Sequence, residues 1–170
     1  PKSAKSLSDP KMICTPDEGA AAAVVTTREI ARARSSRPPV TVAATQLASR
    51  VHGSPAADSV DLAYTPVPDA TPVSTLAARR AYEEAGVGPT DLDVVELQDA
   101  SAWNEIEYME ALELCGPGEA PDMVASGATT LGGRLPINPS GGLLSRGEPP
   151  GASQLGQIYE MVQQLRGDAG

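Results

Sequence analysis

Two helical patterns with a short apolar segment between them, in residues 74–112, constrain the fold of this chain more than any other feature. Ser74 predicts the start of the first helix, in which alanines and Tyr82 recur at spacings of three and four residues until Gly86 ends it. The segment DVVEL, residues 93–97, predicts a short strand that leads directly into the second helix. Apolar residues recur every third position in that second helix: Trp103, Ile106, Met109 and Leu112. A strand between two helices is typical of α/β proteins in which part of the sheet is parallel.

The flanking segments continue this alternation of strands and helices. Small and β-branched residues at 20–25 predict a buried strand, and residues 40–48 predict another. Between them, Thr27 predicts the start of a short helix that ends at Arg34. Residues 52–73 are rich in proline, alanine and aspartate and predict an irregular loop. A final amphipathic helix is predicted from five apolar residues: Leu155, Ile158, Tyr159, Val162 and Leu165.

The composition excludes several functional classes. The 170 residues are enough to bury a core and to form one domain or one large half of a bigger fold. The 13 lysines and arginines against 22 acidic residues give a net charge of −9, and no basic stripe predicts nucleic-acid binding. No apolar run reaches the roughly 18 residues of a membrane span, and no secretory pattern is visible. We expect a cytoplasmic protein whose true N-terminus lies upstream of Pro1.

The sequence offers few residues for metal binding or for histidine catalysis. Cys14 and Cys115 lie far apart without metal-ligand spacing around them, which predicts buried free thiols. His52 is the only histidine and lies in a loop-like stretch beside Gly53 and Ser54. We therefore expect no metal site, and a Ser-His-Asp mechanism would depend on a histidine without visible partners.

Turn-forming residues are concentrated in the segment LPINPSGGLLSRGEPPG, residues 135–151. Near the end of this loop, the carboxylate of Glu148 lies between Gly147 and Pro149. Proline restricts the backbone, and glycine permits the close approach of another group. The loop therefore presents an acid either to solvent or to a binding site.

Three segments, in this order, resemble the C-terminal half of a thiolase, and most closely one of the sterol-carrier or lipid-transfer type. They are EGAAAAVV at 18–25, the helix–strand–turn succession at 74–105, and GGRLPINPSGGLLSRGEPPGAS at 132–153. The resemblance extends from about Cys14 to Gly167. It implies an α/β, thiolase-like fold of two similar α-β-α halves, of which this chain is the C-terminal one and contains a mixed sheet. Residues 135–151 would form an active-site loop of that fold.

The catalytic residues of thiolases are changed in this chain. The resemblance implies that a cysteine in the N-terminal half takes the acyl group, so neither cysteine of this chain matches that nucleophile. Gln98 stands where thiolases carry Asn and where the lipid-transfer type carries His, and Ala100 stands where that type carries Cys. Glu148 stands where the family pattern has His in a Gly-His-Pro loop. The chain ends at Gly170, before the segment that would hold a second catalytic cysteine.

The difference between histidine and Glu148 changes the chemistry that the loop can support. The family's histidine helps to activate the nucleophilic cysteine, because the thiolate rather than the thiol attacks a thioester. A carboxylate is a weak base unless burial raises its pKa, and its negative charge disfavours a neighbouring thiolate. The resemblance therefore implies the fold more directly than it implies ordinary thiolysis.

Glu148 and Gln98 are the two catalytic candidates. Glu148 is either a general base or acid facing a coenzyme A-linked substrate, or a loop acid that is solvated or paired with Arg146. Gln98 either polarises a thioester carbonyl or holds an ordered water, or it hydrogen-bonds the end of its strand. Both interpretations stay open for each residue.

Five residues of the loop are candidates for substrate binding: Asn138, Ser140, Gly141, Gly142 and Gly147. We expect the Asn-Pro-Ser-Gly-Gly segment to shape the floor of the pocket. The functional alternative is that its backbone N–H groups contact coenzyme A or an oxyanion.

The remaining polar and aromatic candidates are interpreted as structural. Asp99 is expected to cap the helix that follows it. Asn104 and Glu105 lie one turn into that helix. Tyr108 and Tyr159 lie on helical stripes and are interpreted as core residues.

The resemblance implies carbon–carbon bond chemistry on a lipid or steroid acyl-coenzyme A thioester, either thiolase-type acyl transfer or retro-aldol cleavage. Coenzyme A would be part of the substrate, and we expect no separate cofactor. The family also implies a homodimer and association with a small partner carrying a zinc ribbon and an OB-fold. The alternative is a non-catalytic thiolase-fold subunit for lipid transfer or scaffolding. A third hypothesis is a separately encoded half that completes its pocket with another polypeptide.

Overall fold

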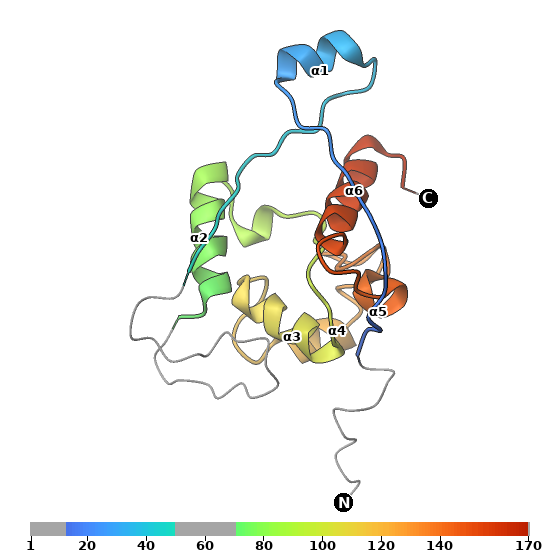
Figure 1. The fold of residues 1–170 in the computed structure, drawn as a ribbon. Coiled ribbons are helices and arrows are strands. Elements are labelled where there is room, and N and C mark those ends of the chain that lie inside the picture. The colour runs from blue at the N-terminus through green and yellow to red at the C-terminus, as the bar shows by residue number, and fades with distance from the viewer. Residues whose placement is uncertain (1–12, 50–70, 170) are drawn as a thin grey trace, which may run out of the picture.

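The computed structural model describes residues 13–49 and 71–169, and these residues form short helices joined by long connections (Figure 1). The helices are α1 (Arg28–Arg34), α2 (Val73–Ala85), the 3-10 helix η1 (Pro89–Asp91), α3 (Ala102–Ala111), α4 (Ala120–Ala125), α5 (Gly142–Arg146) and α6 (Ser153–Arg166). His52 and most of the predicted loop at 52–73 lie outside the described residues. No helix in the described ranges has the length and apolarity that crossing a membrane requires.

Local capping chemistry explains some of the helix ends, while α2, α4, α5 and α6 begin without a hydrogen bond from an N-cap side chain. Thr27 caps α1, where its Oγ1 accepts a hydrogen bond from the Ile30 N–H at 3.4 Å, and this confirms the predicted short helix. Gly86 ends α2 in the left-handed conformation, with φ at 70°, as predicted. The prediction that Ser74 caps α2 is wrong, because the helix begins one residue earlier, directly after Pro72. Proline fixes φ close to the helical value and lacks the N–H that a first turn leaves without a partner.

The apolar core lies between α3, α4 and the two segments around residues 95–97 and 135–137. Met109 on α3 and Leu135 are fully buried. The core cluster consists of Val95, Leu97, Met109, Leu114, Ala120, Leu135 and Ile137. Ile106 and Leu112 pack against it as the spacing of the second helix predicts, whereas Trp103 is 57% exposed. The helix predicted from Leu155 onward is confirmed as α6, but Leu165 on its apolar stripe is exposed.

The predicted strand at 93–97 forms one parallel bridge rather than a ladder. Val95 pairs with Ile137. The Val95 N–H donates to the Pro136 carbonyl at 3.0 Å, and the Asn138 N–H donates to the Val95 carbonyl at 2.8 Å. Isolated bridges, and no named strand, occur within the described residues, so the expected mixed sheet is not observed there.

The first described segment lies on the outside of the molecule. It runs past α5 and α6, forms α1 at one end, and returns alongside α2 (Figure 1). The prediction of buried strands at 20–25 and 40–48 is wrong for this structure: Val24 is 96% exposed and Leu47 is 92% exposed. No backbone hydrogen bond joins either stretch to another described residue. A strand is held by its neighbours, and these stretches have no neighbouring strand in the described part of the chain.

Candidate functional site

Glu148 is held by two side chains that come from distant parts of the sequence. The Cys14 Sγ donates to its Oε2 at 3.4 Å. The Gln98 Nε2 donates to its Oε1, so both oxygens of the carboxylate have a donor. The structure therefore brings together the two predicted catalytic residues, and it adds Cys14, which sequence reasoning treated as a structural thiol.

Backbone pairing of the segment at residues 13–16 creates this convergence. On one side, the Cys14 N–H donates to the Ala100 carbonyl at 2.9 Å, next to Gln98. On the other side, the Glu148 N–H donates to the Thr15 carbonyl at 2.9 Å. The segment thus lies between the turn that follows the 93–97 segment and the end of the 135–151 loop. No spacing along the sequence connects Cys14 with Glu148, which is why the sequence did not identify the thiol.

Gly147 is required by this close approach. Its φ is 79°, in the left-handed region. A Cβ at this position would lie 2.8 Å from the Cβ of Asp17 and 3.2 Å from the Thr15 carbonyl oxygen. The glycine therefore lets the loop lie against the 13–16 segment and place Glu148 beside Cys14.

Asn138 connects the loop to the core. Its Oδ1 accepts a hydrogen bond from the Leu97 N–H at 2.8 Å, and its backbone adopts a φ of 49°. Asparagine tolerates this left-handed conformation better than most residues. The side chain is buried, and its Nδ2 has no hydrogen-bond partner among the described residues. Asn138 thus anchors the start of the loop, because its side chain accepts the Leu97 N–H in the way that a backbone carbonyl would in a strand.

The Glu96 carboxylate holds the loop at Ser140. Glu96 accepts from the Ser140 N–H at 3.0 Å and from the Ser140 Oγ at 2.9 Å. Arg146 donates to the Ser140 Oγ at 2.8 Å and lies 3.9 Å from Glu96. Arg146 is therefore paired with Glu96 and Ser140, and not with Glu148.

Asp99 caps α5, and the prediction that it caps α3 is wrong. Its Oδ1 accepts from the Leu143 N–H at 2.7 Å, while Ser101 caps α3 by accepting from the Asn104 N–H at 3.1 Å. A Cβ at Gly142 would lie 2.0 Å from Asp99 Oδ2, so glycine is required there. The chain folds so that the N-terminus of α5 reaches Asp99, and a rule based on adjacent residues cannot foresee this contact.

The N–H groups that, in the functional alternative, would contact coenzyme A or an oxyanion donate within the loop. Besides Ser140, the Gly141 N–H donates to the Asn138 carbonyl at 2.9 Å and the Gly142 N–H donates to the Ser140 Oγ at 3.2 Å. These contacts fix the shape of the loop. Substrate binding by its residues stays a prediction.

The electrostatics of the site favour a neutral thiol. Burial, followed by the hydrogen bond to Glu148 and the charges of Glu148 and Asp99, raises the pKa of Cys14 to about 11. Burial also raises the pKa of Asp99, against the stabilising Leu143 and Leu144 N–H groups. At neutral pH, Cys14 is therefore a hydrogen-bond donor rather than a thiolate nucleophile.

The other residues singled out in the sequence differ in how deeply they are buried. Burial, and then the charge of Asp99, raises the pKa of Glu105. Tyr108 packs against the core as interpreted, whereas Tyr159 is 62% exposed, so its interpretation as a core residue is wrong. Cys14 is buried as predicted, but Cys115 is only half-buried.

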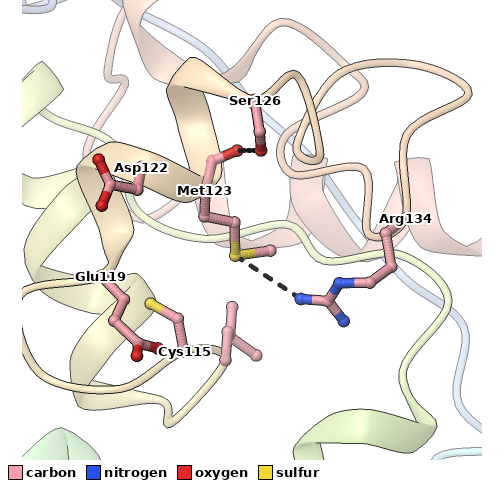
Figure 2. Close-up of a pocket in the computed structure, with 7 residues that line it drawn as sticks. Cys115, Glu119, Asp122, Met123, Ser126 and Arg134 are labelled. Atoms are coloured by element: carbon pink, nitrogen blue, oxygen red, sulfur yellow. Dashed lines mark hydrogen bonds between the residues drawn. The ribbon is translucent and has the colours of Figure 1, made fainter.

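The open depression in Figure 2 is lined by none of the predicted site residues. It has a volume of about 420 Å³ and is lined by Leu114, Cys115, Glu119, Asp122, Met123, Ser126 and Arg134. The Arg134 guanidinium lies 3.7 Å from the Met123 sulfur. Burial, followed by the charges of Glu110 and Glu119, raises the pKa of Cys115 above its ordinary value. We therefore place the candidate site at Glu148.

Residues 56–170 match the family described as thiolase C-terminal domain-like. The chain belongs to this family. Residues that form the loop and the Gln98 turn both lie inside the matched range.

Three similar proteins illustrate the family. Sterol carrier protein 2 of Rattus norvegicus is 50% identical over 98 residues, which cover 58% of this chain and 18% of that protein. The benzoylsuccinyl-CoA thiolase subunit BbsB of Thauera aromatica is 36% identical over 154 residues, which cover 90% of this chain and 37% of the subunit. The solved structure of an Ltp2-ChsH2(DUF35) aldolase matches with a TM-score of 0.54 and 32% identity, covering 62% of this chain and 27% of that chain. The chain thus spans well under half the length of these relatives.

Proposed function

We propose that this chain takes part in carbon–carbon bond cleavage or formation on an acyl-coenzyme A thioester, with Glu148 transferring the proton. The observation that carries this proposal is the pairing of Glu148 with Gln98 at the end of the family's loop. The Gln98 amide has two N–H donors. It would orient the carboxylate with one and, after a side-chain movement, polarise the thioester carbonyl. Relatives named as a thiolase subunit and as an aldolase support this reaction class.

The carboxylate favours retro-aldol cleavage over thiolysis. In a retro-aldol reaction, the base takes the proton of a β-hydroxyl group as the Cα–Cβ bond breaks. The electron pair moves to the thioester enolate, which then takes a proton at Cα. These reaction steps require no cysteine thiolate, so the negative charge of Glu148 has no neighbouring thiolate to destabilise. Thiolase-type acyl transfer would place a thiolate near Glu148 and Asp99, and it is the less favourable alternative.

A second half of the fold would cover the exposed apolar side chains. These are Val24, Val25, Val42, Leu47, Ile158, Tyr159 and Leu165, all at least half exposed. Large exposed apolar areas mark interaction surfaces. We infer that the stretches at 20–25 and 40–48 join a mixed sheet when the other half is present. The names of two relatives, a subunit and an aldolase complex, make a partner protein a reasonable expectation, whether a second copy or a zinc-ribbon and OB-fold protein.

The substitution Glu148→Gln in the native protein tests the catalytic proposal. Glutamine keeps the shape but cannot accept the proton, so we expect kcat with a β-hydroxyacyl-coenzyme A thioester to fall by about 10²–10⁴. Glu83→Gln, at an exposed position on α2, provides the matched control and should keep the parent rate. An unchanged rate in Glu148→Gln would remove this residue from the mechanism.

A non-catalytic subunit for lipid transfer is the second candidate function. It is favoured by the similarity to sterol carrier protein 2. Such a subunit would bind an acyl-coenzyme A thioester in calorimetry and release it unchanged. Turnover that depends on Glu148 would rule this candidate out.

A further inference from the structure

We propose that Cys14 is a positioning residue for Glu148, whose neutral thiol donates to Oε2 while Gln98 donates to Oε1. The proposal rests on the proposed function of Glu148 and names a group that holds it. A positioning role means that Cys14 acts on the carboxylate and forms no bond to the substrate.

The geometry fixes the thiol from both sides. Cys14 is 9% exposed, and its Sγ lies 3.4 Å from Glu148 Oε2, within the range of a sulfur hydrogen bond. Its own N–H is bonded to the Ala100 carbonyl. The next residue, Thr15, accepts the Glu148 N–H. These two backbone bonds hold the Cys14 segment beside the end of the loop, so the thiol lies within reach of the Glu148 carboxylate.

The Glu148 carboxylate can still accept a proton while it is held by the two donors. An ionised carboxylate has about four lone-pair sites, and the thiol and the amide occupy one on each oxygen. The remaining lone pairs can accept a proton from a bound hydroxyl group. Because the carboxylate is already oriented, less conformational entropy is lost when it reaches its reactive geometry.

The surroundings make Cys14 a donor and not a nucleophile. The negative charges of Glu148 and Asp99 both oppose formation of a thiolate, and burial opposes it further. A serine hydroxyl could replace the thiol as a donor. Valine would fill a similar volume without a donor, so the two substitutions separate hydrogen bonding from packing.

Kinetics of Cys14→Ser and Cys14→Val in the native protein test the proposal, with Cys115→Val as the matched control. We expect Cys14→Val to lower kcat for a β-hydroxyacyl-coenzyme A thioester by about 10- to 100-fold, with little change in KM. Cys14→Ser should recover most of the rate. Cys115→Val should behave like the parent.

A second measurement does not depend on turnover. Iodoacetamide labelling at pH 8, with mass spectrometry to separate the two cysteines, should alkylate Cys14 faster in Glu148→Gln than in the parent protein. Removing the negative charge of Glu148 raises the thiolate fraction at Cys14 and leaves the rate at Cys115 unchanged. Equal labelling rates at Cys14 in both proteins would overturn the proposed contact.

The outcomes distinguish this inference from the proposed function. If Glu148→Gln is inactive while Cys14→Val behaves like the parent, the positioning role is wrong and the catalytic role of Glu148 stands. If Glu148→Gln keeps the parent rate, both are wrong. An acyl group found on Cys14 after incubation with the thioester, together with an inactive Cys14→Ser variant, would identify a nucleophile and overturn the positioning role.

Discussion

Residues 93–97 and residues 20–25 resemble one another as sequences but differ in the structure. Both are short apolar stretches that predict a strand. In the first, Val95 and Leu97 are buried and bonded to the 136–138 segment. In the second, Val24 and Val25 are at least 84% exposed, and the stretch has no backbone partner in the described chain. Residues 40–48 follow the second pattern.

The difference shows that the apolar content of a stretch predicts that it needs burial, but does not predict which segment will cover it. The loop beside this segment accepts from the Val95 N–H through the Pro136 carbonyl and from the Leu97 N–H through the Asn138 side chain. The Asn138 N–H donates back to the Val95 carbonyl. The 20–25 stretch is followed closely in the sequence by α1, which has no buried residues. An isolated apolar stretch cannot satisfy its backbone groups by itself. The same stretch would become a strand if a second half of the fold supplied a neighbour.

Hydrogen exchange should show the largest difference between the two stretches. The Leu97 and Asn138 amides are buried and bonded, so their opening should approach the global unfolding free energy, about 5–15 kcal/mol. The Val24 and Val25 amides should exchange with almost no protection in a chain that adopts this structure. Strong protection of Val24 and Val25 in the native protein would show that another segment or subunit covers them.

Matched leucine substitutions, measured in the chain without the other half of the fold, give the next largest effect. Leu97→Ala should lower the free energy of unfolding by about 2–5 kcal/mol, because it leaves a cavity beside Met109 and Leu135. Leu47→Ala removes the same atoms from a side chain that is 92% exposed in this chain and should change stability by less than about 0.5 kcal/mol. Urea denaturation of both variants measures the two effects. Similar losses in the two variants would contradict the difference in burial.

Asn138 supplies a hydrogen-bond acceptor to the buried segment, and substitutions of Asn138 test how much this acceptor contributes to stability. Asn138→Ala removes the acceptor of the Leu97 N–H and places alanine at a φ of 49°, so we expect a loss of about 1–3 kcal/mol. Asn138→Gly also removes the acceptor but tolerates the backbone conformation, so it should lose less. Equal losses, measured by urea denaturation, would mean that backbone conformation contributes nothing at this position.

The smallest effect concerns the pH dependence of stability near the 93–97 segment. Burial raises the pKa of Asp99 above its ordinary value of 3.8, so the folded protein holds this proton more tightly than the unfolded chain. The corresponding stability is fully present below that ordinary value and is lost as pH rises through the folded pKa. Asp99→Asn should therefore flatten the decline of stability above about pH 4. Asp93→Asn, at an exposed position, is the control and should keep the parent slope in urea midpoints.

Local sequence signals predicted most of the helices. The caps at Thr27 and Gly86, and the apolar spacing of α3, depend on neighbours within four residues, so they are visible in the sequence. Helix α4 and the five-residue helix α5 were not predicted. Each is shorter than two turns, and such helices are stabilised by tertiary contacts rather than by propensity. For α5, the contact is the buried Asp99 carboxylate.

The candidate site was predicted only in part. Gln98 and Glu148 were identified because they replace chemically distinct residues within a family pattern. The role of Asp99 was assigned to the wrong helix, because capping rules consider only the adjacent one. Cys14 was missed because its partner is 134 residues away.

The sequence by itself determined the family, the presence of the longer helices, and the unusual acid in the loop. These depend on residue types and on spacings of a few positions. Only the tertiary structure decided which apolar stretches are buried and that Cys14, Gln98 and Glu148 meet. The physical reason is that burial and long-range hydrogen bonds depend on which distant segments become neighbours, and residue spacing does not record that. The glycines at 142 and 147 are present in the sequence, but the close approaches that require them exist only in the folded chain.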